Sequence, residues 1–212
     1  ALLCGEQKAV LLGNAAAHHA QASALLSLAQ WIAENTGATV GYLTEAANTV
    51  GAQWMGAMPA KDGKNAGQML AGGMKAVLLL NTEPQWDSAL GAAAAQTLAQ
   101  SEMVITLSPF KANMEFSDVL LPIAPFTETS GSFVNAEGLL QSFYAVVKPL
   151  AEARPGWKVL RVLGNLLDIA GFEFQTSQDV LARATNTLAG EVISVPVALL
   201  NNTAAAVSSN IV

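Results

Sequence analysis

Short apolar runs and segments with helical spacing alternate along the first half of the chain. The run at 8–14 predicts a buried strand, and apolar residues from His18 to Asn35 recur at the spacing of a helix that would end near Gly37. A second apolar run at 38–43 predicts another strand. A strand, a helix and a strand in this order imply that the two strands are parallel.

The same alternation continues to about residue 171. We expect an irregular connection with one helical turn at 44–65, short helices at 66–73 and 88–100, and buried strands at 75–81, 102–108 and 117–123. The continuous apolar strands predict an α/β fold, a doubly wound, mostly parallel sheet of about five strands with helices on both faces. Ligands of such sheets bind outside the carboxyl ends of the strands, so a pocket is expected at the loops that follow them.

The C-terminal part differs in composition. Apolar residues at 155–170 predict a helix with Gly171 as its C-terminal cap, and a weaker helix is expected at 177–189. The tail at 192–212 has no charged side chain, but Pro196 and several polar residues interrupt it, so no membrane span is expected. These features predict a domain at 1–171 and a small C-terminal appendage at 172–212.

The chain has unusually little charge. Apolar residues make up 52% of it and charged residues only 12%, against roughly 25% charged residues in ordinary soluble domains. A tightly packed alanine-rich domain and a part of a larger assembly both explain this, and the shortage of surface charge favours the assembly. It also predicts that the isolated chain exposes an apolar patch and self-associates. The net charge of −6, with scattered Lys and Arg, disfavours nucleic acid as a partner.

The chain has few cysteine and histidine residues that could act in catalysis or bind a metal. Cys4 is the one cysteine, which excludes an intramolecular disulfide and a four-cysteine iron–sulfur cluster within the chain. His18 and His19 are the two histidines, and adjacent helical residues point about 100° apart, so the pair does not suit one metal. No glycine-rich phosphate loop follows the first strand, and no Gly-x-Ser-x-Gly elbow occurs. The sequence is still compatible with a phosphate bound at a helix N-terminus. We therefore expect no metal ligand and no catalytic residue in this chain.

A polar segment at 127–141 follows the strand at 117–123. It contains Gly131 and Gly138 among Ser, Thr, Asn and Glu residues. Glycines permit backbone angles closed to other residues, and the polar side chains can bond to nearby backbone groups. The segment therefore fits either a tight turn between two extended segments or an ordered irregular loop buried inside the protein.

The motifs around this segment resemble the molybdopterin-oxidoreductase superfamily in their order along the chain. That superfamily has an aliphatic strand with an acidic start, a loop of the form E-x-x-G-T-x-x-N-x-E-G-R-x-Q, and a tryptophan that leads into a helix. The matching residues here are Asp118, Leu121, Pro122, Glu128, Gly131, Asn135, Glu137, Gly138, Gln141, Pro155 and Trp157, with Ser132 at the usual Thr position.

Within the superfamily, the chain is most similar to the C-terminal part of the large peripheral-arm subunit of bacterial NADH:quinone oxidoreductase, respiratory complex I. The segment at 43–59 is similar to the E-x-x-N-x-x-G-A segment of that subunit. The resemblance implies a structural and docking module without its own cofactor, on the cytoplasmic face of the inner membrane, with other peripheral-arm subunits as partners. The iron–sulfur clusters of such a subunit are expected in an N-terminal part that this chain does not contain.

One departure from the pattern concerns the cofactor. The superfamily loop has Arg after Glu-Gly, and here Leu139 stands at that position. A guanidinium suits pterin and phosphate recognition, and leucine cannot replace it. The resemblance therefore implies that Glu128, Gly131, Asn135, Glu137 and Gly138 form a vestigial cofactor loop. The alternative is a part of a working molybdopterin-dependent oxidoreductase, for example of the formate dehydrogenase type.

Overall fold

The computed structural model describes residues 3–17, 19, 21–59 and 63–188. The fold is mixed α/β, with parallel sheets flanked by helices, and this confirms the predicted fold class. None of the helices in these ranges is long and apolar enough to cross a bilayer. The chain divides into two compact units, the first from Ala1–Met58, Phe133–Gln141 and Asn186–Val212 and the second from Pro59–Ser132 and Ser142–Thr185.

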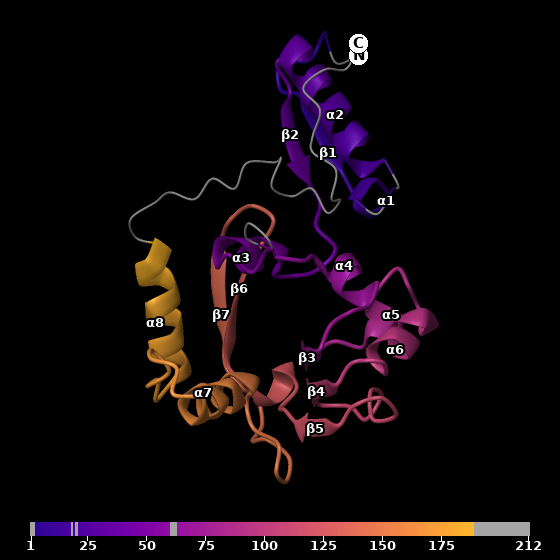
Figure 1. Cartoon of the computed structure of the whole chain (residues 1–212). Helices are drawn as coiled ribbons and strands as arrows, with labels where there is room; N and C mark the ends of the chain where they lie inside the picture. The colour runs from indigo at the N-terminus through magenta and orange to yellow at the C-terminus, as the bar shows by residue number, and fades with distance from the viewer. Residues whose placement is uncertain (1–2, 18, 20, 60–62, 189–212) are drawn as a thin grey trace. The chain divides into compact units, whose positions relative to one another are not determined.

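The first unit contains the predicted strand–helix–strand. β1 (Ala9–Leu12) and β2 (Thr39–Tyr42) pair in parallel, and α2 (Ala22–Thr36) packs along them (Figure 1). α2 ends as expected at Gly37, which adopts a left-handed conformation with φ 70°. The short helix α1 (Asn14–Ala17) precedes α2, and α3 (Thr49–Trp54) is the helical turn expected in the long connection.

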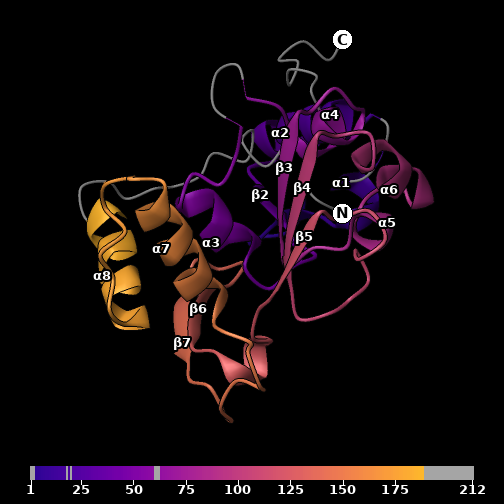
Figure 2. The same ribbon diagram turned by 60° about the horizontal axis from the view of Figure 1, so that its bottom comes forward.

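The second unit is built on a three-stranded parallel sheet in the order β3-β4-β5 (Figure 2). Its strands are β3 (Ala76–Leu80), β4 (Met103–Ser108) and β5 (Val119–Pro122), and its short helices are α4 (Ala66–Leu70), α5 (Pro84–Asp87) and α6 (Ala92–Leu98). The predicted parallel strands are therefore present, and they are distributed over two sheets.

One face of the three-stranded sheet forms the core of this unit. Leu79 and Val104 pack there with apolar residues of α4 and α6, namely Leu70, Ala94 and Leu98. The opposite face is exposed along its edge strands, whereas Leu107 in the central strand is fully buried. The register places Leu78 beside Ile105 and Val119, and Leu80 beside Leu107 and Leu121. Of these, Leu78 and Leu80 are each 45% exposed, and Val119 is 40% exposed.

The chain continues through the 3₁₀ turn η1 (Phe126–Glu128) into the paired strands β6 (Gly131–Val134) and β7 (Leu140–Phe143). A five-residue connection joins β6 to β7, and only antiparallel strands can be joined so closely. The polar segment at 127–141 is therefore largely a β-hairpin, in agreement with a tight turn between two extended segments.

The helices α7 (Gly156–Leu166) and α8 (Ser177–Leu188) follow the hairpin. The helix predicted at 177–189 is confirmed, but the predicted cap at Gly171 is wrong. α7 ends at Leu166, and Asp168 adopts a left-handed conformation with φ 54°, while Ile169 N donates to Gly164 O at 2.9 Å. An aspartate tolerates this conformation better than most residues, which is why the chain can turn three residues before the glycine. The appendage predicted at 172–212 stays a prediction, since its tail lies outside the described residues.

Candidate functional site

The acidic residue at the start of the β5 motif serves strand pairing. Asp118 Oδ2 accepts a hydrogen bond from Val104 N at 2.7 Å, and Asp118 N donates to Val104 O at 2.9 Å. Val104 is 1% exposed, so its N–H needs a partner inside the protein. Asp118 therefore fixes how β5 begins beside β4.

Glu128 and Gly131 lie at the start of the hairpin. Glu128 Oε2 accepts a hydrogen bond from Leu150 N at 3.0 Å, which ties η1 to the chain beyond the hairpin. The ring of Phe143 lies against Gly131, and a Cβ at Gly131 would come within 2.6 Å of it. One residue further on, the hydroxyl oxygens of Ser132 and Ser142 are hydrogen-bonded across the strands at 2.8 Å.

Asn135, Glu137 and Gly138 come together in the hairpin turn. Asn135 Oδ1 accepts from Glu137 N at 3.0 Å and from Leu139 N at 2.9 Å, and Gly138 N donates to Asn135 O at 3.0 Å. Gly138 has φ 82°, in the left-handed region that disfavours side chains. The side chain of Asn135 thus closes a local turn, while Glu137 is exposed. The motif residues of this turn shape the backbone.

Asn48 is a structural partner of the hairpin that sequence reasoning did not identify. Asn48 precedes α3, where an asparagine commonly caps the helix, yet its side chain makes no such bond. Its Oδ1 instead accepts a hydrogen bond from Val134 N at 2.8 Å. A Cβ at Gly51 would collide with this same Oδ1 atom. Asn48 and Gly51, the Asn and Gly of the segment at 43–59, therefore act together. In the sequence, the one sign of this contact was that the two residues lie three positions apart in the motif.

The loops that follow β3 and β4 form a buried polar cluster. Asn113 is 1% exposed, and its Nδ2 donates to Thr82 O at 2.9 Å. Thr106 Oγ1 and Ser117 Oγ are 2.7 Å apart, and Ser117 Oγ also donates to Asn113 O at 2.7 Å. The amide oxygen of Asn113 has no protein partner among the described residues. Apart from this atom, the cluster is satisfied by bonds that hold the two loops together.

A metal centre is not evident in the described ranges. They contain no group of three or more His, Cys, Asp and Glu side chains close enough to share an ion. Cys4 is exposed, and His19 Nδ1 accepts a hydrogen bond from Gln21 N at 3.0 Å, whereas His18 lies outside the described residues. Burial raises the pKa of Tyr42, and backbone hydrogen bonds lower the pKa of Asp179. Neither of these residues belongs to the hairpin.

The hairpin segment does not fit the anionic and hydrogen-bonding groups of a pterin cofactor. Residues 127–141 contain two glutamates and no Lys or Arg, so the segment would repel a phosphate. Leu139, at the position of the superfamily arginine, is 56% exposed and offers no donor from its side chain. The amide oxygen of Asn135 is already used by the turn.

Comparison with known proteins identifies similar sequences. The family model for molybdopterin oxidoreductases matches residues 2–166. The Staphylococcus aureus (strain bovine RF122 / ET3-1) protein named "Putative formate dehydrogenase SAB2186c" is 38% identical over 80 residues, which cover 35% of this chain and 8% of that protein. The Bacillus subtilis (strain 168) protein named "Probable oxidoreductase YjgC" is 37% identical over 70 residues, which cover 33% of this chain and 7% of that protein.

The matches differ in how much of each protein they cover. The aligned segments are a small fraction of the relatives' own length. The family match, in contrast, runs through both parallel sheets, the hairpin and all of α7. The chain belongs to the molybdopterin oxidoreductase family.

Proposed function

We propose that this chain is a structural part of a molybdopterin-dependent oxidoreductase that uses formate as its substrate. Membership of the molybdopterin oxidoreductase family supports the reaction class. The name of the similar Staphylococcus aureus protein supports formate. Because the aligned segment covers 8% of that relative, the proposal concerns an enzyme larger than this segment.

In this proposal, the contribution of the chain is to hold a scaffold and not to carry out chemistry. The observation that carries this role is the use of the motif side chains. Asn135 closes its own turn, Asn48 holds Val134 N, and Asp118 holds Val104 N. Side chains committed to backbone groups are poorly placed to bind a ligand, so we assign the contacts to the charged groups of the cofactor to residues outside 127–141.

A second candidate is the large peripheral-arm subunit of a NADH:quinone oxidoreductase. The observation that favours it is Leu139, which removes the guanidinium expected beside a pterin cofactor. In that case the fold is retained without the cofactor. The partners would be other peripheral-arm subunits on the cytoplasmic face of the membrane.

The two candidates differ in the electron donor of the whole enzyme. We would purify the complete protein that contains this chain, with any tightly bound subunits, and measure formate-dependent reduction of a viologen dye. In parallel, NADH-dependent reduction of a soluble quinone would be measured. Formate-dependent reduction supports the first candidate, and NADH-dependent quinone reduction without a response to formate overturns it in favour of the second.

A further inference from the structure

A cleft in the second unit lies between the base of the hairpin, α7 and α8. Its inner end has a volume of about 350 Å³. Aromatic side chains of Phe143, Tyr144 and Trp157 line this end, and Val180 and Leu181 of α8 complete its apolar wall. Figure 2 shows α7 beside α8 at this place. An apolar cavity of this size suits a small organic molecule.

Hydroxyl groups border the apolar end. The side chains of Ser130, Ser132, Ser142 and Ser177 line it. The Ser132 and Ser142 hydroxyls bond to each other, and each hydroxyl keeps further hydrogen-bonding capacity, because it has one donor and two acceptor sites. A few polar groups around an aromatic wall are typical of sites that orient a ring-shaped ligand.

The outer end of the cleft is positively charged. It has a volume of about 570 Å³ and shares Ser130, Trp157, Ser177 and Gln178 with the inner end. Lys148, Arg154 and Lys158 line it, three of the ten Lys and Arg residues in a chain with net charge −6. This concentration of cations contrasts with the rest of the chain.

Two of these three cations form no ion pair with the described carboxylates near the outer end. Glu128 is the one carboxylate that lines it, and its Oε2 accepts a hydrogen bond from Leu150 N. Arg154 donates to Ala151 O and Ala153 O and lies 3.9 Å from a carboxylate oxygen of Glu152. Among the residues that the structure describes, neither Lys148 nor Lys158 forms an ion pair.

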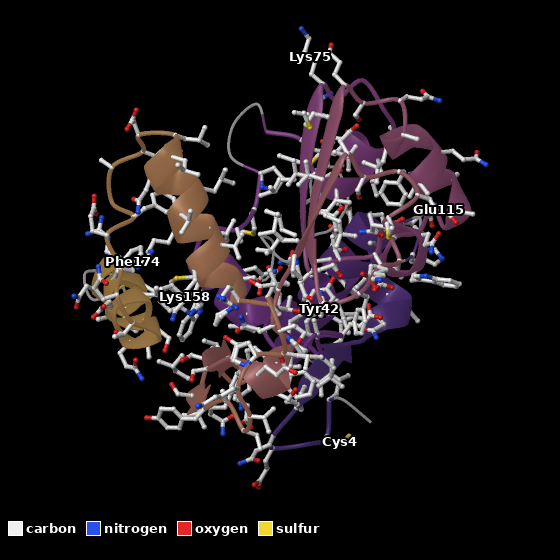
Figure 3. All side chains as sticks on the ribbon, turned by 90° about the horizontal axis from the view of Figure 1, so that it is seen from below. Cys4, Tyr42, Lys75, Glu115, Lys158 and Phe174 are labelled. Carbon is white, nitrogen blue, oxygen red and sulfur yellow. The ribbon has the colours of Figure 1, made fainter. Side chains whose placement is uncertain are left out.

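Trp157 and Lys158 connect the two ends. Lys158 Nζ lies 5.4 Å from the centroid of the Trp157 ring, and Trp157 lines both ends. Figure 3 shows Lys158 reaching from α7 towards α8. An aromatic ring and an unpaired ammonium group at this separation fit a ligand whose anionic group is attached directly to a ring.

We propose that this cleft binds a small organic anion, with a planar ring in the apolar end and a carboxylate, sulfonate or phosphate group beside Lys148 and Lys158. The site shares no lining residue with the Asn135 turn, and it depends neither on a molybdopterin cofactor nor on the choice between the two functions above.

The test uses two probes of the same shape, 2-naphthalenesulfonate and neutral 2-naphthalenemethanol, titrated calorimetrically into the 212-residue chain. Saturable binding with a clear preference for the sulfonate is expected. The double variant Lys148→Gln/Lys158→Gln should weaken sulfonate binding about fivefold, as expected for two exposed charges, and leave binding of the alcohol unchanged. Equal affinity for the two probes, or no saturable binding, overturns the proposal.

The matched control is Lys75→Gln/Lys111→Gln, which removes two exposed lysines of the same unit that do not line the cleft. It should retain the full preference for the sulfonate. An equal loss in the control variant would mean that net charge and not the cleft attracts the anion, and the proposal would fail.

A second pair of variants tests the apolar end. Ala184 on α8 lines the cavity, and Ala184→Phe should fill it and abolish binding of both probes. Ala182→Phe adds the same ring at an exposed position of the same helix and should bind both probes normally. Circular dichroism melts confirm that both variants fold. Unchanged binding by a folded Ala184→Phe variant contradicts the proposal.

Discussion

Gly138 is the residue of the hairpin turn with the least freedom to change. Its φ of 82° lies in the left-handed region, and the Trp54 ring lies 3.6 Å from where a Cβ would stand. A β-branched residue in that conformation typically costs about 1–3 kcal/mol. We expect Gly138→Val to lower the free energy of unfolding by that amount, measured by urea denaturation.

The neighbouring positions provide the control for Gly138. Ala136 is exposed in the same turn, and Leu139 is 56% exposed. Ala136→Val and Leu139→Ala should therefore change the stability much less than Gly138→Val. An unchanged stability for Gly138→Val would mean that this glycine is not held in a special conformation.

Asn48 and Gly51 allow a sharper test, because they are argued to act as one unit. Asn48→Ala removes the acceptor of Val134 N, and Val134 is only 5% exposed. Leaving a buried N–H without a partner costs about 1–3 kcal/mol. Gly51→Ala should also destabilise the protein, because its Cβ would displace the Asn48 side chain.

The double variant shows whether the two residues are coupled. Once Asn48 is alanine, the Cβ at residue 51 has no amide to displace, and Gly51→Ala should cost little. We expect the double variant to be about as stable as Asn48→Ala alone. Strictly additive losses in the double-mutant cycle would contradict the coupling.

At the level of elements, α8 begins with a charged cap. Asp179 Oδ2 accepts from Thr176 N at 2.8 Å and from Gln175 N at 3.0 Å, and Thr176 Oγ1 accepts from Asp179 N at 3.1 Å. These bonds, led by the one from Thr176 N, lower the pKa of Asp179 below its ordinary value of 3.8. The carboxylate therefore stabilises the folded chain above its ordinary pKa, and this contribution is lost as the pH falls through the lowered value.

The pH dependence follows from that cap. We expect Asp179→Asn to melt at a lower temperature than the wild-type chain at about pH 6, where the carboxylate is fully ionised. The difference should shrink as the pH falls below 3.8 and disappear once the pH is below the lowered pKa of Asp179, because the carboxyl group is then protonated in the folded chain as well. Glu115→Gln, at an exposed position away from α8, is the control and should show no such pattern. A wild-type advantage that persists fully in acid would contradict the assigned role of Asp179.

The elements show what the sequence could and could not predict. Hydrophobic periodicity identified every parallel strand and the helices α2, α6, α7 and α8, since each carries a continuous apolar run or an apolar stripe in the sequence. The strand expected to be buried at 8–14 was wrong in its burial, because the residues of β1 are exposed or half-buried. The end of α7 was mispredicted, because Asp168 takes the left-handed conformation that was assigned to Gly171. The bond between Asn48 and Val134 joins residues 86 positions apart, and no local pattern contains such a contact. The residues that line the cleft were not predicted as a site, because they too come from separate parts of the chain.

At the scale of the whole molecule, one sheet face stays exposed around a buried Leu107. Leu78 and Val119 share this face with Leu80, Leu121 and Met103, and each of the five is at least 37% exposed. An apolar face of this kind usually marks an interaction surface. We expect the isolated chain to self-associate through it, as the low charge content also predicts.

Sedimentation velocity over a range of concentrations tests that expectation. Val119→Lys puts a charge on the edge strand β5, where lysine is well tolerated, and should shift the chain towards monomer. Val146→Lys makes the same change at an apolar residue that is 82% exposed outside the sheet, and it should not. A wild-type chain that stays monomeric at high concentration would rule out this self-association.

We propose that this chain belongs to a working molybdopterin-dependent oxidoreductase. The most direct test is the metal content of the complete protein that contains this chain, purified from its native host and analysed by mass spectrometry of metals. We expect stoichiometric molybdenum or tungsten that is retained through gel filtration. Protein that is folded and complete but contains neither metal would contradict it.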